Sequence, residues 1–281
     1  MLFGKFQIHI INDGFFRLDG GAMYGIVPKT LWSKVEQVDS DNRILMSCNP
    51  LLVRTGKYNL LIDTGTGEKF PDKFNQIYAI DLPRGLIPGL AKLGLKPEDI
   101  THVLNTHLHF DHCGGNTKFD ESGKPVPAFP NAEYVINKLE WEDAVSPNPR
   151  SQASYLPENL LPIQEAGQLR LIEGDTEVIP GLRVQVTGGH TRGHQIVFIE
   201  SEAKTAVYLA DLIPLTAQIK PNWVMSYDLY PVNTVDYKEK FIQDAFKHNY
   251  LLLFEHSPNI KAAYLKKEES GRLKLEKVIL D

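Results

Sequence analysis

The sequence of 281 residues contains only two cysteines, Cys48 and Cys113, so a disulfide framework is excluded. One disulfide is conceivable, but two reduced thiols are expected. It has no basic excess either: the formal net charge is −5, whereas a nucleic-acid partner requires a concentrated basic surface. No apolar run approaches the roughly 18 residues of a membrane span, and the opening "MLFGKFQIHIINDG" lacks the apolar core of a signal peptide. These absences predict a cytoplasmic protein that binds neither nucleic acid nor membranes.

The chain also lacks low-complexity segments and a linker rich in proline and glycine, so we expect one domain over residues 1–281. Short strand-like runs and a few helices alternate along the whole length, in an order that occurs once before residue 140 and once after it. Two sheets packed face to face, with helices outside, would bury such strands on both faces. The expected fold class is therefore α+β, with two similar halves.

Local patterns predict the individual elements. Residues 51–55 and 58–63 form two apolar runs around Gly56-Lys57, which is typical of a β-hairpin. Residues 84–95 have helical apolar spacing that ends at Gly94, and Pro97 begins a turn. Further strands are expected at residues 100–106, 133–137, 183–187, 195–200, 205–210 and 250–254, a helix at 236–248 and a turn at 269–272 between two final strands.

One short segment is crowded with side chains that bind metals. The stretch "NTHLHFDHCGG", residues 105–115, contains His107, His109, Asp111 and His112. Neutral imidazole and carboxylate are the ligands that Zn²⁺ and similar divalent ions take. The alternative is a polar loop in which the histidines only hydrogen-bond to their neighbours. Because chance explains four such residues in six positions poorly, we favour a metal site.

Three later residues have the context to complete that site. His190 lies in the glycine-rich loop "TGGHTRGH", Asp211 ends the strand-like run "VYLAD", and His256 follows "YLLLFE". Taken singly, each has an ordinary explanation as a loop histidine, a helix-capping aspartate or a core histidine. Residues at strand ends from both halves could nevertheless converge on one edge of a sandwich.

The order His-x-His-x-Asp-His, then His, Asp and His, resembles that of the metallo-β-lactamase superfamily, and the resemblance runs from "LLIDTG" at 60–65 to His256. It implies a four-layer αββα sandwich with a dinuclear centre, and it implies that Asp63 supports the ligands from behind. The expected ions are two divalent metals, first of all Zn²⁺, with Fe, Mn or Co as alternatives. The resemblance assigns the first ion to His107, His109 and His190, the second to Asp111, His112 and His256, and Asp211 to both.

The remaining candidates receive lesser roles. His109 favours hydrolysis, because the di-iron oxidoreductases of the superfamily typically have a glutamate at that position. Cys113 is expected to be a small buried residue, since Asp211 occupies the position at which some β-lactamases use cysteine. His194 is expected to hydrogen-bond within its loop. The other histidines, His9, His102 and His248, lack any such context.

Two segments are informative about the substrate. Residues 18–34 look like the N-terminal loop of quorum-quenching N-acyl homoserine lactone lactonases, and residues 210–231 are similar to that group and to related organophosphate hydrolases. Their large side chains would form an apolar mouth suited to an acyl chain. The alternative is that these residues fill a core or a dimer contact. The residues concerned are Met23, Tyr24, Ile26, Val27, Trp223, Met225 and Tyr227.

One position departs from the lactonases, which carry a tyrosine three residues after the bridging aspartate, where this chain has Pro214. Either Tyr24 or Tyr227 replaces that phenol or the substrate differs. The predicted function is hydrolysis of the lactone ring through a metal-bridging hydroxide, with Asp111 carrying a proton to the leaving alkoxide. A phosphotriester or aryl ester hydrolase is the first alternative, and a catalytically silent protein that binds a small ligand is the second. Whether the chain forms a homodimer is left open.

Overall fold

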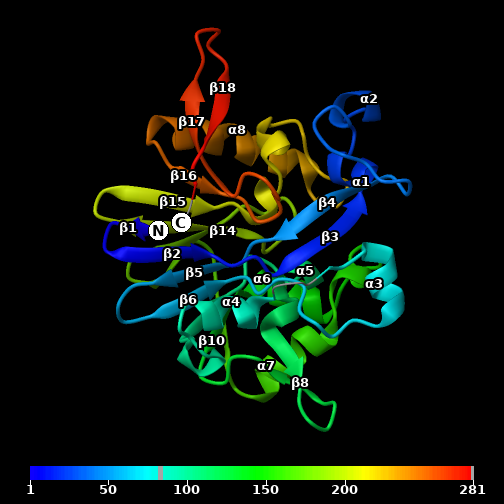
Figure 1. Cartoon of the computed structure of the whole chain (residues 1–281), viewed down its shortest axis with the longest axis vertical. Helices are drawn as coiled ribbons and strands as arrows, with labels where there is room; N and C mark the ends of the chain where they lie inside the picture. Colours follow the sequence, from blue (N-terminus) through cyan, green and yellow to red (C-terminus); the bar gives the residue numbers. More distant parts are fainter. Residues whose placement is uncertain (82–84, 280–281) are drawn as a thin grey trace. The chain divides into compact units, whose positions relative to one another are not determined.

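A computed structural model of the chain describes residues 1–81 and 85–279 (Figure 1), which divide into two compact units. Unit 1 comprises Met1–Phe15 and Cys48–Thr176, and unit 2 comprises Phe16–Ser47 and Glu177–Asp281. Each unit contains one seven-stranded sheet, as expected for two similar halves. The division lies later than residue 140, because the strands at 133–137 and 169–172 pair within the first sheet. That residues 1–281 act as a single domain stays a prediction.

The sheet of unit 1 has the strand order β1-β2-β5-β6-β7-β10-β11. Antiparallel β5 and β6 form the predicted hairpin, and its turn requires Gly56, whose φ of +85° is unfavourable for other residues. From β6 to β11 the neighbouring strands pair in parallel, and a parallel pair needs a crossover segment, here containing α4 between β6 and β7. The strands are β1 (Leu2–Phe3), β2 (Phe6–Ile10), β5 (Leu51–Arg54), β6 (Asn59–Ile62), β7 (His102–Leu104), β10 (Glu133–Asn137) and β11 (Leu169–Ile172).

Short helices and a small hairpin complete unit 1. The helix predicted at 84–95 is α4 over Leu86–Lys92, and its first predicted residue, Arg84, lies outside the described residues. Leu86 and Leu90 of α4 pack with Leu52 and Leu61 in the core of this unit. The other elements are α3 (Asp72–Tyr78), α5 (Phe110–Cys113), α6 (Lys138–Val145), α7 (Leu161–Glu165), β8 (Thr117–Phe119), β9 (Pro125–Pro127) and the 3₁₀ turns at 97–99, 114–116, 152–154 and 157–159.

The sheet of unit 2 runs in sequence order from β12 to β18. From β13 to β18 the neighbouring strands pair antiparallel except β15 and β16. These two are parallel and are joined by the long helix α8 (Pro231–Lys247). The strands are β12 (Thr176–Ile179), β13 (Leu182–Val186), β14 (Gln195–Ser201), β15 (Lys204–Tyr208), β16 (Leu251–Leu253), β17 (Ala262–Lys267) and β18 (Leu273–Lys277). All of these from β13 onward match predicted strands, and the turn at 269–272 separates the last two.

Helix α8 is amphipathic in the expected way. Its buried residues, Thr234, Lys238, Phe241, Ile242 and Ala245, recur at the spacing of one helical face, and Phe241 and Ile242 pack in the core of unit 2. The helix begins five residues earlier than predicted, at Pro231, a residue favoured in a first turn. The remaining elements are β3 (Gly14–Asp19) paired with β4 (Arg43–Cys48), α1 (Gly20–Tyr24), α2 (Lys29–Trp32) and the 3₁₀ turns at 210–212 and 216–219.

Across residues 1–81 and 85–279, no helix has both the length and the apolar character needed to cross a membrane.

Candidate metal centre

The four ligand candidates of unit 1 lie just beyond strand β7. The chain leaves the strand at Leu104, continues to His107 and His109, and then turns through the single helical turn α5, which carries Asp111 and His112. All four side chains are buried. The imidazole centroid of His107 lies 4.6 Å from that of His109 and 4.0 Å from that of His112, so the three rings of unit 1 face a common space.

A buried carboxylate at the end of β6 holds this group in place. One oxygen of Asp63 accepts the backbone N–H of Thr106 at 2.8 Å, and the other accepts the Thr106 hydroxyl at 2.7 Å and faces Nδ1 of His112 at 3.0 Å. Asp63 itself has a φ of +57°, a conformation that aspartate tolerates better than most residues. The resemblance gave Asp63 a supporting role, and the structure places it in contact with a ligand candidate.

A second buried carboxylate supports the segment between His107 and His109. Glu140 on α6 accepts the backbone N–H of Leu108 at 2.9 Å and the hydroxyl of Tyr155 at 3.0 Å. The ring of Tyr155 in turn lies 5.1 Å from that of His109. These contacts fix the backbone between the two histidines.

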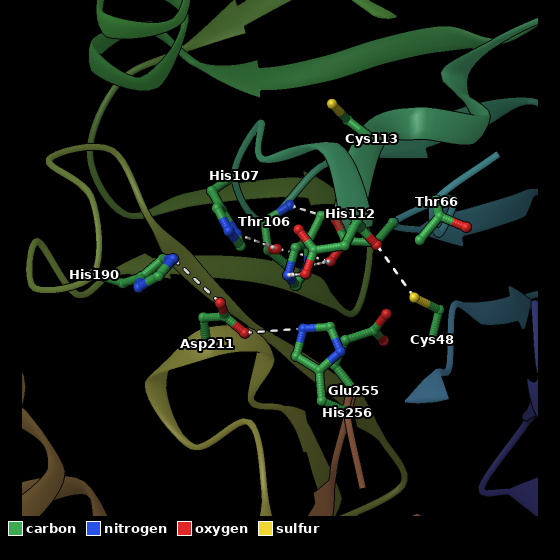
Figure 2. Close-up of polar contacts among 12 residues, drawn as sticks. Cys48, Thr66, Thr106, His107, His112, Cys113, His190, Asp211, Glu255 and His256 are labelled. Carbon is green, nitrogen blue, oxygen red and sulfur yellow. Dashed lines mark hydrogen bonds and ion pairs between the residues drawn. The ribbon is translucent and has the colours of Figure 1, made fainter. Parts of the chain in front are cut away.

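In unit 2, the carboxylate of Asp211 lies between two histidines (Figure 2). Its Oδ2 is 3.1 Å from Nε2 of His190, and its Oδ1 is 3.2 Å from Nε2 of His256. Asp211 follows strand β15, and its backbone N–H donates to Nε2 of His194 at 3.1 Å. Nδ1 of His194 contacts the hydroxyl of Thr187 at 2.7 Å, so this histidine hydrogen-bonds within its loop as predicted and also fixes the backbone of Asp211.

The opposite ring nitrogens of the two histidines are also engaged. Nδ1 of His190 lies 2.9 Å from Oδ1 of Asp228, and Nδ1 of His256 lies 2.8 Å from the backbone carbonyl of Ser47. Sequence reasoning missed both partners. Asp228 stands in no recognisable motif, and a backbone carbonyl leaves no side-chain signal at Ser47.

These partners determine which nitrogen carries the proton on four histidines. Carboxylate and carbonyl oxygens only accept, so Nδ1 of His112, His190 and His256 must donate. Nδ1 of His107 faces the Thr106 hydroxyl at 3.2 Å, and that hydroxyl gives its proton to Asp63, so this Nδ1 donates as well. Each neutral ring then presents a lone pair on Nε2, which is the arrangement that protein partners impose on metal-binding histidines.

The contacts of Asp211 strengthen this interpretation. When both rings are neutral with the proton on Nδ1, the Nε2 lone pairs of His190 and His256 face carboxylate oxygens, and two acceptors at 3.1–3.2 Å repel each other. A divalent cation shared by these atoms turns the same geometry into attraction. The donor set of unit 2 therefore fits a metal ion, with the two oxygens of Asp211 directed at different histidines.

Cys113 is placed as a small buried residue. Its thiol is fully covered and lies 3.2 Å from the carbonyl oxygen of Leu108, to which it donates. Burial raises the pKa of this thiol well above its usual value, which disfavours the thiolate form that metals bind. Both cysteines are free, as expected.

Most of the predicted substrate-binding residues are covered. Tyr24 is 0% exposed: its ring stacks on Trp32, meets Trp223 edge-on, and its hydroxyl donates to Glu36 at 2.7 Å. Tyr227, by contrast, is 37% exposed. Of the predicted substrate-binding residues, Ile26 is on the surface, and the following are buried in unit 2: Met23, Tyr24, Val27, Trp223 and Met225. In this structure the buried residues fill a core, which is one of the alternatives that the sequence left open. Their contact with a substrate stays a prediction.

Unit 1 contains an aromatic cluster that sequence reasoning did not identify. The rings of Phe70, Phe74 and Tyr78 lie 5.0–6.0 Å from that of Phe110, the residue between His109 and Asp111. Burial, and then the carboxylate of Asp111, raise the pKa of the Tyr78 phenol. The phenol thus lies within electrostatic range of Asp111. The spacing Phe70, Phe74, Tyr78, one residue every four, was the signal available in the sequence.

Comparisons with known proteins agree with this geometry. The family model described as "Metallo-beta-lactamase superfamily" matches residues 43–256. A probable metal-dependent hydrolase from Staphylococcus aureus, known from a crystal structure, has 36% sequence identity to this chain. The two structures match with a TM-score of 0.89 over 100% of both chains. This match confirms the predicted fold class.

Two lactonases are also similar to the chain. The N-acyl homoserine lactonase of Bacillus cereus is 33% identical over 168 residues, which span 56% of this chain and 60% of that protein. The chain thus matches the curated relative over less than two thirds of its length. AidC, a dizinc quorum-quenching lactonase in complex with a product, has a TM-score of 0.79 and 22% identity, with 100% of this chain and 97% of that chain covered, a likeness of fold alone.

Proposed function

Because the chain belongs to the metallo-β-lactamase superfamily, we propose that it is a metal-dependent hydrolase that opens the ring of N-acyl homoserine lactones. The observation that carries the proposal is the common tautomer of the ligand candidates: in both units, oxygen acceptors hold Nδ1 and leave Nε2 for a metal. The similarity to the Bacillus cereus lactonase supports the substrate class.

We assign the ligands as the family order implies. His107, His109 and His190 hold one divalent ion, Asp111, His112 and His256 hold the other, and Asp211 binds both. Imidazole and carboxylate ligands suit Zn²⁺ best, and Fe, Mn or Co would accept the same donors. When bound, such ions lower the pKa of water and polarise the oxygen that is attacked.

The chain's own residues would complete the reaction. Asp111 is proposed to carry a proton to the alkoxide that leaves when the ring opens, because it combines a carboxylate with a place beside the ligand histidines of unit 1. Pro214 has no hydroxyl, and its carbonyl oxygen accepts the backbone N–H of His256 at 3.2 Å. If the substrate is a lactone, another phenol would supply the hydrogen bond that Pro214 cannot.

Tyr227 and Tyr78 are the candidates for that phenol. Tyr24 is the weaker one, since its buried hydroxyl already donates to Glu36. Tyr227 is partly exposed in the segment that resembles the lactonases, and the Tyr78 phenol lies near Asp111 within the aromatic cluster of unit 1. The apolar rings beside Tyr78 also offer contacts to an acyl chain.

The absence of a hydroxyl at Pro214 favours one alternative, hydrolysis of a phosphotriester or an aryl ester at the same metal site. A substrate screen separates the two functions: kcat/KM for butanoyl-, hexanoyl- and decanoyl-homoserine lactone is compared with that for a phosphotriester, an aryl ester and a β-lactam. We expect the lactones to be hydrolysed fastest. Efficient hydrolysis of the phosphotriester with every lactone untouched would reject the lactonase proposal, and a loaded protein inactive on all of them would indicate a ligand-binding role.

A further inference from the structure

Asp228 is a buried carboxylate whose two oxygens reach two different parts of unit 2. Its side chain is 2% exposed. Oδ1 contacts Nδ1 of His190 at 2.9 Å, and Oδ2 accepts the backbone N–H of Met225 at 3.3 Å. One carboxylate therefore orients a ligand candidate and closes the turn that ends the segment 223–227.

Backbone contacts join the same two parts of the chain. The N–H of Leu229 donates to the carbonyl of His190 at 3.0 Å, and that of Tyr230 donates to the carbonyl of Gly189 at 2.9 Å. A Cβ on Gly189 would lie 2.3 Å from the hydroxyl oxygen and 2.9 Å from the backbone of Thr234 on α8, so only glycine allows this approach. Backbone hydrogen bonds thus join the loop that carries His190 to the residues that follow the segment 223–227.

A buried lysine connects this assembly to α8. Lys238 is almost completely covered, and its ammonium donates to the carbonyl of Trp223 at 2.8 Å. Burial lowers the pKa of Lys238 to about 7, and the negative charge of Asp228 acts in the opposite direction by favouring the protonated lysine. The lysine therefore partly balances the charge of the buried Asp228 carboxylate. It also holds Trp223 at the start of the segment 223–227, whereas Asp228 holds the end of that segment.

We propose that Asp228 is a positioning residue that couples metal binding at His190 to the order of residues 223–227. Its carboxylate selects the His190 tautomer that binds a metal, and the same side chain fixes the segment that carries Trp223, Met225 and Tyr227. By linkage, an ion bound at His190 stabilises this segment, and a disordered segment weakens the ion. The inference rests on the proposed metal site and is independent of the substrate.

Asp228→Asn tests the coupling, because it keeps the shape and removes the charge. An amide nitrogen turned toward Nδ1 selects the wrong tautomer of His190, and the loss of such a partner typically costs about 10–100-fold in metal affinity. Competition with a chromophoric chelator for Zn²⁺ should show this loss for one ion per chain. Asp236→Asn, the same change at an exposed position of α8, should bind both ions as the wild type does.

Hydrogen exchange provides the second readout. In the wild type, loading with Zn²⁺ should slow hydrogen exchange at residues 223–227. In Asp228→Asn, this protection by Zn²⁺ should disappear. Without metal, the variant should keep wild-type exchange in the sheet of unit 2. A purely structural role for Asp228 would instead raise exchange across unit 2 with and without metal. Unchanged affinity in a folded Asp228→Asn, or protection of 223–227 that survives the substitution, would overturn the proposal.

The unchanged chain can also be tested, should the variant fail to fold. Nitrogen NMR of the metal-free wild type should show the proton of His190 on Nδ1, and exchange at 223–227 should depend on the metal. A proton on Nε2, or exchange that is independent of metal, would refute the inference. A wild type that binds no divalent ion would refute the proposed metal site instead, so the two failures are distinguishable.

Discussion

Asp63→Asn should weaken both the fold of unit 1 and its hold on metal. Three donors converge on the Asp63 carboxylate, at 2.7–3.0 Å: the backbone N–H and hydroxyl of Thr106 and Nδ1 of His112. An asparagine keeps one acceptor oxygen, which the backbone N–H of Thr106 requires. Its amide nitrogen then faces the Nδ1–H of His112, and two donors meet.

The magnitude follows from this geometry. Leaving the buried N–H of His112 without its charged acceptor costs about 1.5–3 kcal/mol of unfolding free energy. For a chain of 281 residues, that corresponds to a Tm lower by roughly 3–5 °C. If His112 instead moves its proton to Nε2, the fold is spared but the lone pair that a metal needs is lost. Either outcome lowers metal affinity, by about 10–100-fold.

The assay measures the two effects separately. Thermal unfolding of the metal-free protein reports on stability, and chelator competition reports on affinity. Glu121→Gln, the same loss of charge on an exposed loop of unit 1, is the matched control and should change neither. Wild-type Tm together with wild-type affinity in Asp63→Asn would show that the carboxylate does not hold His112 as the distances indicate.

Further substitutions address the remaining assignments. Asp211→Ala should weaken the binding of both ions, because its two carboxylate oxygens face different histidines. His256→Ala should mainly empty one site. If elemental analysis finds the same loss of metal in both variants, Asp211 is not a shared ligand. Cys113→Ser should keep both metals and most activity with a lower Tm, and a fall in metal content would make the thiol a ligand. Tyr227→Phe and Tyr78→Phe test the two candidate phenols. The substitution that removes the lactone's hydrogen bond should lower kcat/KM by an amount that corresponds to about 1–2 kcal/mol of lost transition-state binding. If kcat/KM is unchanged in both variants, both phenols are excluded.

Local patterns were sufficient for the elements that carry the site. The apolar runs around Gly56 predicted the hairpin, and those before Asp211 and His256 predicted β15 and β16. Helix α8 was found, but its start was missed, because its first turn mixes polar and apolar residues without helical spacing. These successes depend on periodicity and turn chemistry, which a sequence shows directly.

Tertiary partners were beyond sequence reasoning. Asp228 reaches His190 across 38 residues, and Ser47 reaches His256 across 209 with a backbone carbonyl that any residue could supply. The apolar residues of 18–34 and 210–231 were identified correctly as apolar, but hydrophobicity is the same at a binding surface and in a core. In the structure Tyr24 packs against Trp32 and Trp223, and contact of these residues with a substrate stays a prediction.

We propose that this chain opens lactone rings with the help of metal held by its histidines and aspartates. The most direct test is the rate of ring opening of hexanoyl-homoserine lactone, followed by proton release, in protein that has been stripped with a chelator and then titrated with Zn²⁺. We predict that activity vanishes on stripping and returns in step with the addition of two ions per chain. Hydrolysis that persists without metal, or a fully loaded protein that leaves the lactone intact, would contradict the account.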